Sequence, residues 1–79
     1  TIALFTLGQV ERQRGNHAAA AQAFEQCGTG LRGDALAEAA SAWYAAGQAG
    51  RGRTAAERYL SDFPSGVHGS RMRVLLGRE

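Results

Sequence analysis

The sequence predicts an all-α protein, and three observations lead to this fold class. Apolar residues recur at the three- and four-residue spacings of a helix face in five successive segments. Glycine or proline separates these segments, and none of them alternates polar and apolar residues for long enough to form a β-strand. Sixteen of the 79 residues are Ala, which favours closely packed helices over a thick layered core.

The first half of the chain predicts two helices, residues 1–13 and 17–27, joined by a short turn. Gly15 supplies the turn. Asn16 is the expected N-cap of the second helix, because its side chain can accept hydrogen bonds from free backbone N–H groups. The second helix is rich in Ala, and we expect Cys27 at its end to be a small buried side chain.

The second half predicts three further helices. Asp34 is the expected N-cap of a helix over residues 35–48, and residues 50–52 then break it. A fourth helix over residues 54–62 ends before Pro64, since proline disfavours helical backbone in the residue before it. The fifth segment carries the apolar residues Met72, Val74, Leu75 and Leu76.

A unit of 34 to 35 residues recurs in this pattern. Gly15 and Gly50 lie 35 residues apart, and each is followed by an Ala and then by an aromatic residue. These pairs are Ala20 with Phe24, and Ala55 with Tyr59. A small residue where two antiparallel helices cross lets them approach closely, and an aromatic ring one turn later fills the space where they diverge. Each hairpin has an apolar face that the next can cover, so the units should stack.

This spacing resembles that of the tetratricopeptide repeat family. The first unit matches the family pattern at Leu7, Gly8, Gly15, Ala20 and Phe24. In the second unit Gly50, Ala55 and Tyr59 agree, whereas Trp43 replaces the expected glycine and should push neighbouring helices apart. The resemblance implies an α-solenoid with repeats over residues 1–34 and 35–69 and a terminal helix over 70–79.

Residues 63–66 resemble a junction in repeat proteins of the bacterial envelope, and also in the repeat tails of bacterial regulatory proteins. The location therefore stays open between envelope or periplasm and cytoplasm, and so does a membrane-associated parent protein. Because Thr1 lies inside a predicted helix, we expect the chain to be a piece of a longer protein. No apolar run approaches the 18 residues of a membrane span.

In the tetratricopeptide repeat family, the first helix of each unit lines a concave surface that binds a ligand. Carried over position by position, the resemblance implies a binding surface made of Phe5, Gln9, Arg12, Gln13, Tyr44, Gln48, Arg71 and Arg78. Ile2 and Val74 belong to the same set, and Ala37 and Ala40 would form a shallow floor. Such a mixed apolar and basic surface suits a peptide or helix that carries acidic residues. The alternative is that these are ordinary solvent-facing positions.

Other site motifs are excluded by their context. Residues 28–33 match G-x-G-x-x-G, but a helix precedes them and Asp34 would repel a phosphate, so we interpret them as a link between repeats. His17, Cys27 and His68 lack the short spacings of a zinc site, and we expect both histidines to be solvated. We expect no catalysis, no cofactor and no bound metal.

The charge pattern favours a protein partner. The net charge is +2, and the nine Arg residues are interspersed with acids instead of forming a basic stripe. We therefore expect no nucleic-acid partner, and nucleic-acid binding through the Arg residues is only a distant third hypothesis. The leading hypothesis is a protein–protein interaction module. The second is a structural or self-associating segment whose apolar ends pair with further repeats or with a second copy. The residues expected at these ends are Ile2, Phe5, Val74 and Leu75.

Overall fold

The computed structural model describes residues 2–26 and 32–77, and in these ranges it has five α-helices and no strand. The all-α prediction is therefore confirmed for this part of the chain. Cys27 and residues 28–31 of the expected inter-repeat link lie outside the described residues. The helices are α1 (Ile2–Gln13), α2 (His17–Glu25), α3 (Arg32–Ala45), α4 (Ala49–Asp62) and α5 (Gly69–Gly77).

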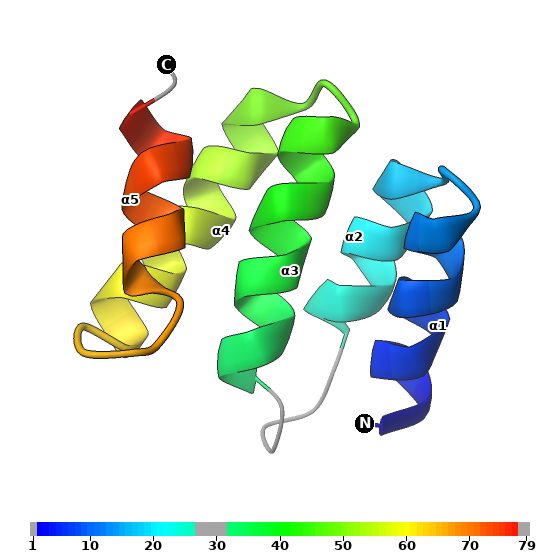
Figure 1. Cartoon of the computed structure of the whole chain (residues 1–79), viewed down its shortest axis with the longest axis horizontal. Coiled ribbons are helices and arrows are strands. Elements are labelled where there is room, and N and C mark those ends of the chain that lie inside the picture. The colour runs from blue at the N-terminus through cyan, green and yellow to red at the C-terminus, as the bar shows by residue number, and fades with distance from the viewer. Residues whose placement is uncertain (1, 27–31, 78–79) are drawn as a thin grey trace.

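Helices that follow one another in the chain pack side by side, and α3 also contacts α5. The result is a flat array with extents of 27 × 27 × 15 Å. Figure 1 shows the helices in a row from α1 to α5, with α5 passing in front of α4. The array consists of two hairpins, α1–α2 and α3–α4, followed by the single helix α5.

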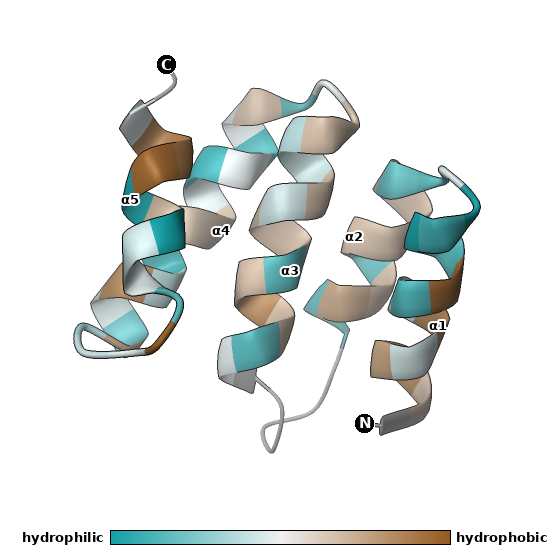
Figure 2. Cartoon of the chain, viewed as in Figure 1, coloured by the Kyte–Doolittle hydropathy of each residue, from teal (hydrophilic) through white to brown (hydrophobic). Residues whose placement is uncertain are grey.

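Two apolar clusters hold the array together, and α3 contributes to both. The first joins α2 to one side of α3 through Ala20, Ala21, Phe24, Ala35, Ala39, Ala42 and Trp43. The second joins α3, α4 and α5 through Ala37, Ala40, Ala55, Ala56, Tyr59, Met72 and Leu75. Because most of these residues are Ala, the ribbon of α2 and α3 is mostly pale between teal bands, and the strongest brown lies in α1, in α5 and in the segment before α5 (Figure 2).

The turn between α3 and α4 is not where the glycine spacing predicts it. Gly47 has a φ of +79°, in the left-handed region that favours glycine, and it matches Gly15, which has a φ of +82°. Gly50 lies inside α4, which begins at Ala49, five residues earlier than expected. The break at residues 50–52 and the turn at Gly50 are therefore wrong.

The structural repeat is consequently 32 residues long. Gly15 donates its backbone N–H to Arg12, and Gly47, 32 residues later, donates to Tyr44 in the same way. The next bonds of the two turns also correspond, since Asn16 donates to Glu11 and Gln48 donates to Trp43. Further along, the backbone N–H of Ala20 donates to the carbonyl of Asn16, and the N–H of Gly52 donates to the carbonyl of Gln48 in the same way. A small residue therefore lies at the same place in each hairpin's second helix.

Both hairpins have a close approach between a ring and a glycine. A Cβ at Gly8 would lie 2.6 Å from the Phe24 ring, so α2 packs directly on the α1 backbone there. In the second hairpin a Cβ at Gly52 would lie 2.6 Å from the Tyr44 ring and 3.2 Å from the Ala40 carbonyl oxygen. The glycine is thus in the first helix of one hairpin and in the second helix of the other.

Trp43 does not separate the helices. Its side chain is buried in the first cluster, where Ala20, Ala21 and Ala39 leave room for the indole. α3 packs against α2 on this side and against α4 on the other. One of the two adjacent aromatic residues is therefore fully packed, and Tyr44 is half-buried.

The two predicted caps behave differently. Asn16 does precede α2, but its side chain makes no capping hydrogen bond and donates instead to Glu11 at 3.1 Å. Asp34 is not a cap, because α3 begins two residues earlier, at Arg32. Its carboxylate atom Oδ1 lies 2.8 Å from Nε2 of His68, in the segment that leads to α5.

The placement of the second turn can be tested with two glycine substitutions. Gly47→Ala should lower the free energy of unfolding by about 1–2 kcal/mol, because alanine is strained at positive φ. Gly50→Ala should raise it by about 0.5 kcal/mol, because Gly50 is helical and no atom lies within 4 Å of an added Cβ. Urea denaturation measures both, and the reverse order would place the turn at Gly50.

Candidate functional site

Three helices bring charged side chains together around Glu38. Arg12, in the last turn of α1, donates from Nη1 to Glu38 Oε2. Arg71, in the first turn of α5, donates from Nη2 to Glu38 Oε1 at 2.7 Å. Each carboxylate oxygen thus receives one guanidinium. We refer to Arg12, Glu38 and Arg71 as the Glu38 cluster.

The burial of the three side chains differs sharply. The Glu38 side chain is 11% exposed, whereas those of Arg12 and Arg71 are 40% and 43% exposed. An unpaired carboxylate at this depth would be strongly unfavourable, so the two guanidinium groups compensate for the loss of its hydration. Their outer edges remain in solvent.

The local sequence explains how this carboxylate is reached. Glu38 lies in an Ala-rich stretch of α3, and its neighbours three and four positions away include Ala35, Ser41 and Ala42, whose short side chains leave it accessible from α1 and α5. Arg12 also donates from Nη2 to Gln9 Oε1 one turn earlier in α1. The guanidinium of Arg12 is therefore held by two acceptors.

The structure brings together only some of the predicted binding residues. Gln9, Arg12 and Arg71 meet at the Glu38 cluster. Gln13 is exposed at the end of α1, and Gln48 is exposed in the turn before α4. Arg78 and the side chain of Ile2 lie outside the described residues.

The predicted aromatic residues take part in helix packing. Phe5 contacts Phe24 edge to face, with ring centroids 5.3 Å apart, and Tyr44 lies against Gly52. Ala37 and Ala40 are completely buried in the second cluster, so the prediction that they form a floor is wrong. Of the predicted set, the contacts therefore bring Gln9, Arg12 and Arg71 to a common surface.

Glu38 itself is not among the binding residues predicted from the sequence. The resemblance supplied positions in the first helix that face a ligand, and Glu38 is not among the positions it implied. A signal was nevertheless present, because Glu38 is the single charged residue between Asp34 and Arg51. A lone charge in an Ala-rich helix must either face solvent or find a partner.

The two histidines are less solvated than expected. His68 Nε2 lies 2.8 Å from Asp34 Oδ1, and its backbone N–H donates to the Tyr59 hydroxyl at 3.0 Å. His17 is half-buried, and its Nδ1 atom has no hydrogen-bond partner within the described part of the chain. The prediction of two solvated histidines is thus wrong for His68, whose contacts attach the segment before α5 to α3 and α4.

Two further findings concern the residues that the structure describes. Among them, no three His, Cys, Asp or Glu side chains lie close enough together to hold a metal ion. No helix in the same ranges is both long and apolar enough to cross a bilayer.

Comparisons with protein-family models, curated proteins and solved structures find no match to this chain. The geometry of the Glu38 cluster therefore carries the functional argument.

Removal of the central carboxylate should destabilise the fold. We expect Glu38→Ala to lower the free energy of unfolding by about 1–2 kcal/mol, because two charged hydrogen bonds are lost while both arginines can return to solvent. Chemical denaturation measures the change. Glu57→Ala, at an exposed position on α4, is the control and should change stability by less than about 0.5 kcal/mol. Equal effects of the two substitutions would contradict a structural role for the Glu38 cluster.

Proposed function

We propose that the chain is a protein–protein interaction module that binds an acidic peptide segment on the surface shared by α1, α3 and α5. One observation carries this proposal: Glu38 holds Arg12 and Arg71 on either side of it, on two different helices. Each guanidinium has five N–H donors, and only some are used within the chain. The exposed donors can bind carboxylates of a partner through charge-assisted hydrogen bonds.

The charge balance of the cluster favours an anionic partner. Two guanidinium groups and one carboxylate leave a net positive charge, and the positive groups are the exposed ones. A partner carboxylate would therefore meet arginine before it meets Glu38. Because Glu38 already orients both arginines, binding would cost less side-chain entropy than it would for unrestrained arginines.

A tetratricopeptide-like repeat is part of the same proposal. The two hairpins share a 32-residue register of turn hydrogen bonds, and each has small residues where its helices cross. In a stack of such hairpins, alternate helices lie on one side and can display residues along a common surface. This arrangement supports recognition of an extended segment that crosses α1, α3 and α5.

Recognition at this surface would be mainly polar. Phe5 and Tyr44 contribute rings to contacts between helices, and both are half-buried, so only part of each ring is left for a ligand. Gln9 lies next to Arg12, and Gln13 is exposed one residue beyond it. These amides can bind the backbone of a peptide whose acidic side chains pair with the arginines.

A random 12-residue peptide library, displayed and selected on the immobilised chain, tests this proposal. We expect the selected peptides to be enriched in Asp and Glu, and their affinity to fall as salt is raised. Arg71→Gln should lower the affinity for a selected peptide about fivefold, the effect expected when one well-placed exposed ion pair is lost. Fluorescence anisotropy measures this affinity.

Arg73→Gln is the matched control, because Arg73 is an exposed arginine of the same helix outside the Glu38 cluster. It should leave the affinity unchanged. Peptides without acidic enrichment, or equal losses for Arg71→Gln and Arg73→Gln, would refute binding at this surface. Circular dichroism confirms that both variants keep their helices.

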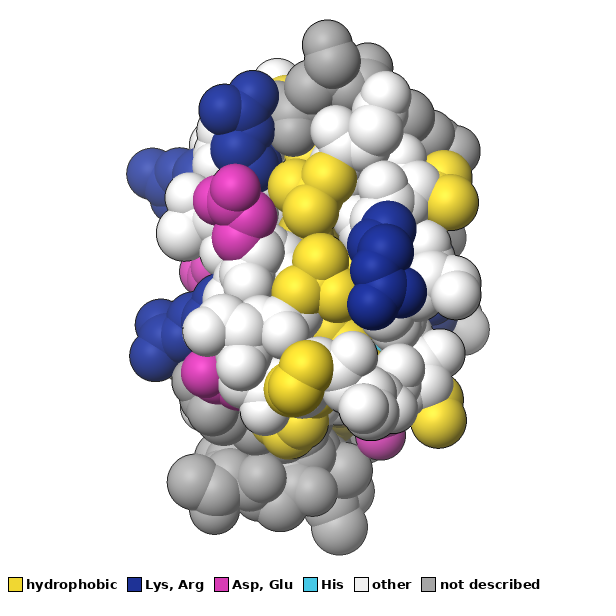
Figure 3. Space-filling view, turned by 90° about the vertical axis from the view of Figure 1, so that its left-hand side faces the viewer, with side chains coloured by type: hydrophobic (Ala, Val, Ile, Leu, Met, Phe, Trp, Pro, Cys, Tyr) yellow, Lys and Arg dark blue, Asp and Glu magenta, His cyan; other side chains and the backbone are white. Residues whose placement is uncertain are grey.

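Self-association is the second candidate function, and the ends of the array favour it. Figure 3 shows hydrophobic side chains in a row on the end formed by α4 and α5, with arginines on both sides. Val74 on α5 is 57% exposed, and Leu7 at the opposite end, on α1, is 48% exposed. Leu75, expected at this end, is instead buried in the second cluster.

Pairing through these ends predicts an average molecular mass that rises with protein concentration. Sedimentation equilibrium should then show dimers or longer assemblies, and Val74→Asp should return the chain to a monomer by placing a charge in the apolar contact. Leu60→Asp is unsuitable for this purpose, because Leu60 also packs on the second cluster. A constant monomer mass at high concentration would eliminate this candidate.

A further inference from the structure

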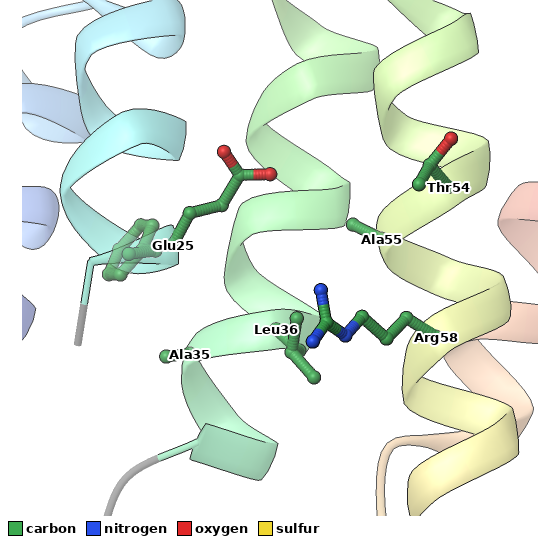
Figure 4. Close-up of a pocket in the computed structure, with 7 residues that line it drawn as sticks. Glu25, Ala35, Leu36, Thr54, Ala55 and Arg58 are labelled. Carbon is green, nitrogen blue, oxygen red and sulfur yellow. The ribbon is translucent and has the colours of Figure 1, made fainter. Parts of the chain in front are cut away.

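A cleft lies between α2 and α4, apart from the Glu38 cluster. Its volume is about 360 Å³, and α3 forms its floor. Figure 4 shows side chains from three helices around it, with Glu25 from α2 and Arg58 from α4 both extending over α3. We refer to it as the α2–α4 cleft; its lining includes Phe24, Glu25, Leu36, Thr54, Ala55 and Arg58.

The two walls of the α2–α4 cleft carry opposite charges. The Glu25 carboxylate accepts a hydrogen bond from the Trp43 indole N–H at 3.0 Å, which fixes its position. Arg58 Nε lies 4.0 Å from Oδ2 of Asp62, one turn further along α4. In the described part of the chain, Glu25 and Arg58 form no ion pair with each other. A ligand can therefore meet a negative group on one side and a positive group on the other.

The space between these charges is apolar. Phe24 and Ala35 are almost completely buried and close the base, and Ala55 packs beside them from α4. Leu36 is half-buried and presents part of an aliphatic side chain to the cleft. Thr54 adds a hydroxyl on the α4 wall, already hydrogen-bonded to the Gly50 carbonyl at 3.1 Å. An aliphatic group would be desolvated on this floor.

A second hollow extends the α2–α4 cleft towards the start of α4. It shares Glu25 and Thr54 with the first and is also lined by Gly50 and Arg51. The Arg51 guanidinium lies over the Trp43 ring, 5.0 Å from its centroid, and is held there by a cation–π contact. The available space is therefore elongated along α4.

From this geometry we propose that the α2–α4 cleft binds a small zwitterion of dipeptide size with an aliphatic side chain. Its ammonium group binds Glu25, its carboxylate binds Arg58 and its side chain lies on the apolar floor. The volume is at the lower end of the range for ligand-binding clefts, so a small molecule fits better than a helix. A ligand with a single charge would gain one ion pair and face repulsion from the other wall.

An NMR titration with the dipeptide alanyl-leucine tests this proposal. We expect the largest shifts in backbone amide signals at Glu25, Leu36 and Arg58. Two blocked analogues each lack one charge: N-acetyl-alanyl-leucine has no ammonium group, and alanyl-leucinamide has no carboxylate. Each should bind about two- to fivefold more weakly, the range expected for one exposed ion pair.

Matched variants assign each charge to its partner. Glu25→Gln should lower the affinity for alanyl-leucine without lowering the affinity for the acetylated analogue. Arg58→Gln should lower the affinity for alanyl-leucine without lowering the affinity for the amide. Glu57→Gln, on α4 outside the cleft, is the control and should bind like the unmodified chain.

Two results would overturn the proposal. One is equal affinity for alanyl-leucine and both blocked analogues, which would mean that the charges of the cleft play no part. The other is an absence of shifts at the cleft when alanyl-leucine is added to the unmodified chain and the spectrum shows a folded protein. The Glu38 cluster is not involved in either result, so this proposal stands or fails independently of peptide binding.

Discussion

The whole array depends on how closely its helices approach one another. Within the described residues, Ala makes up most of the buried apolar core, and the large fully buried side chains are Phe24, Trp43, Tyr59 and Met72. Small side chains bring the backbones of neighbouring helices together, and each large side chain then fills the space that remains in its cluster. The same closeness allows side chains from non-adjacent helices to meet, as Arg12 and Arg71 do at Glu38.

Because α3 lies at the centre of the array, its faces are used in different ways. One carries Glu38 and binds arginines of α1 and α5, whereas another forms the floor of the α2–α4 cleft. The Trp43 indole connects the core to this cleft by donating its N–H to Glu25. Glu25 at the cleft and both arginines of the Glu38 cluster are thus each hydrogen-bonded to a buried residue of α3.

The sequence predicts the number of helices and most of their ends, because apolar periodicity and proline are local signals. It does not predict the second turn, because Gly50 and Gly52 look like a break although both are helical and Gly47 makes the turn. Of the candidate site, Gln9, Arg12 and Arg71 are found through the family resemblance. Glu38 and the α2–α4 cleft are missed, because their partners lie 18 to 33 residues away in the chain and only the packing brings them together.

The shared membership of α3 in both apolar clusters also affects how the chain unfolds. In a simple stack, each helix contacts only its neighbours, and the ends can open while the remainder stays folded. Here Ala39 and Ala40 are adjacent residues of α3, yet the first belongs to the cluster with α2 and the second to the cluster with α4 and α5. Loss of α3 would therefore expose both clusters at once. The backbone amides of α3 should therefore exchange with solvent only when both clusters are lost.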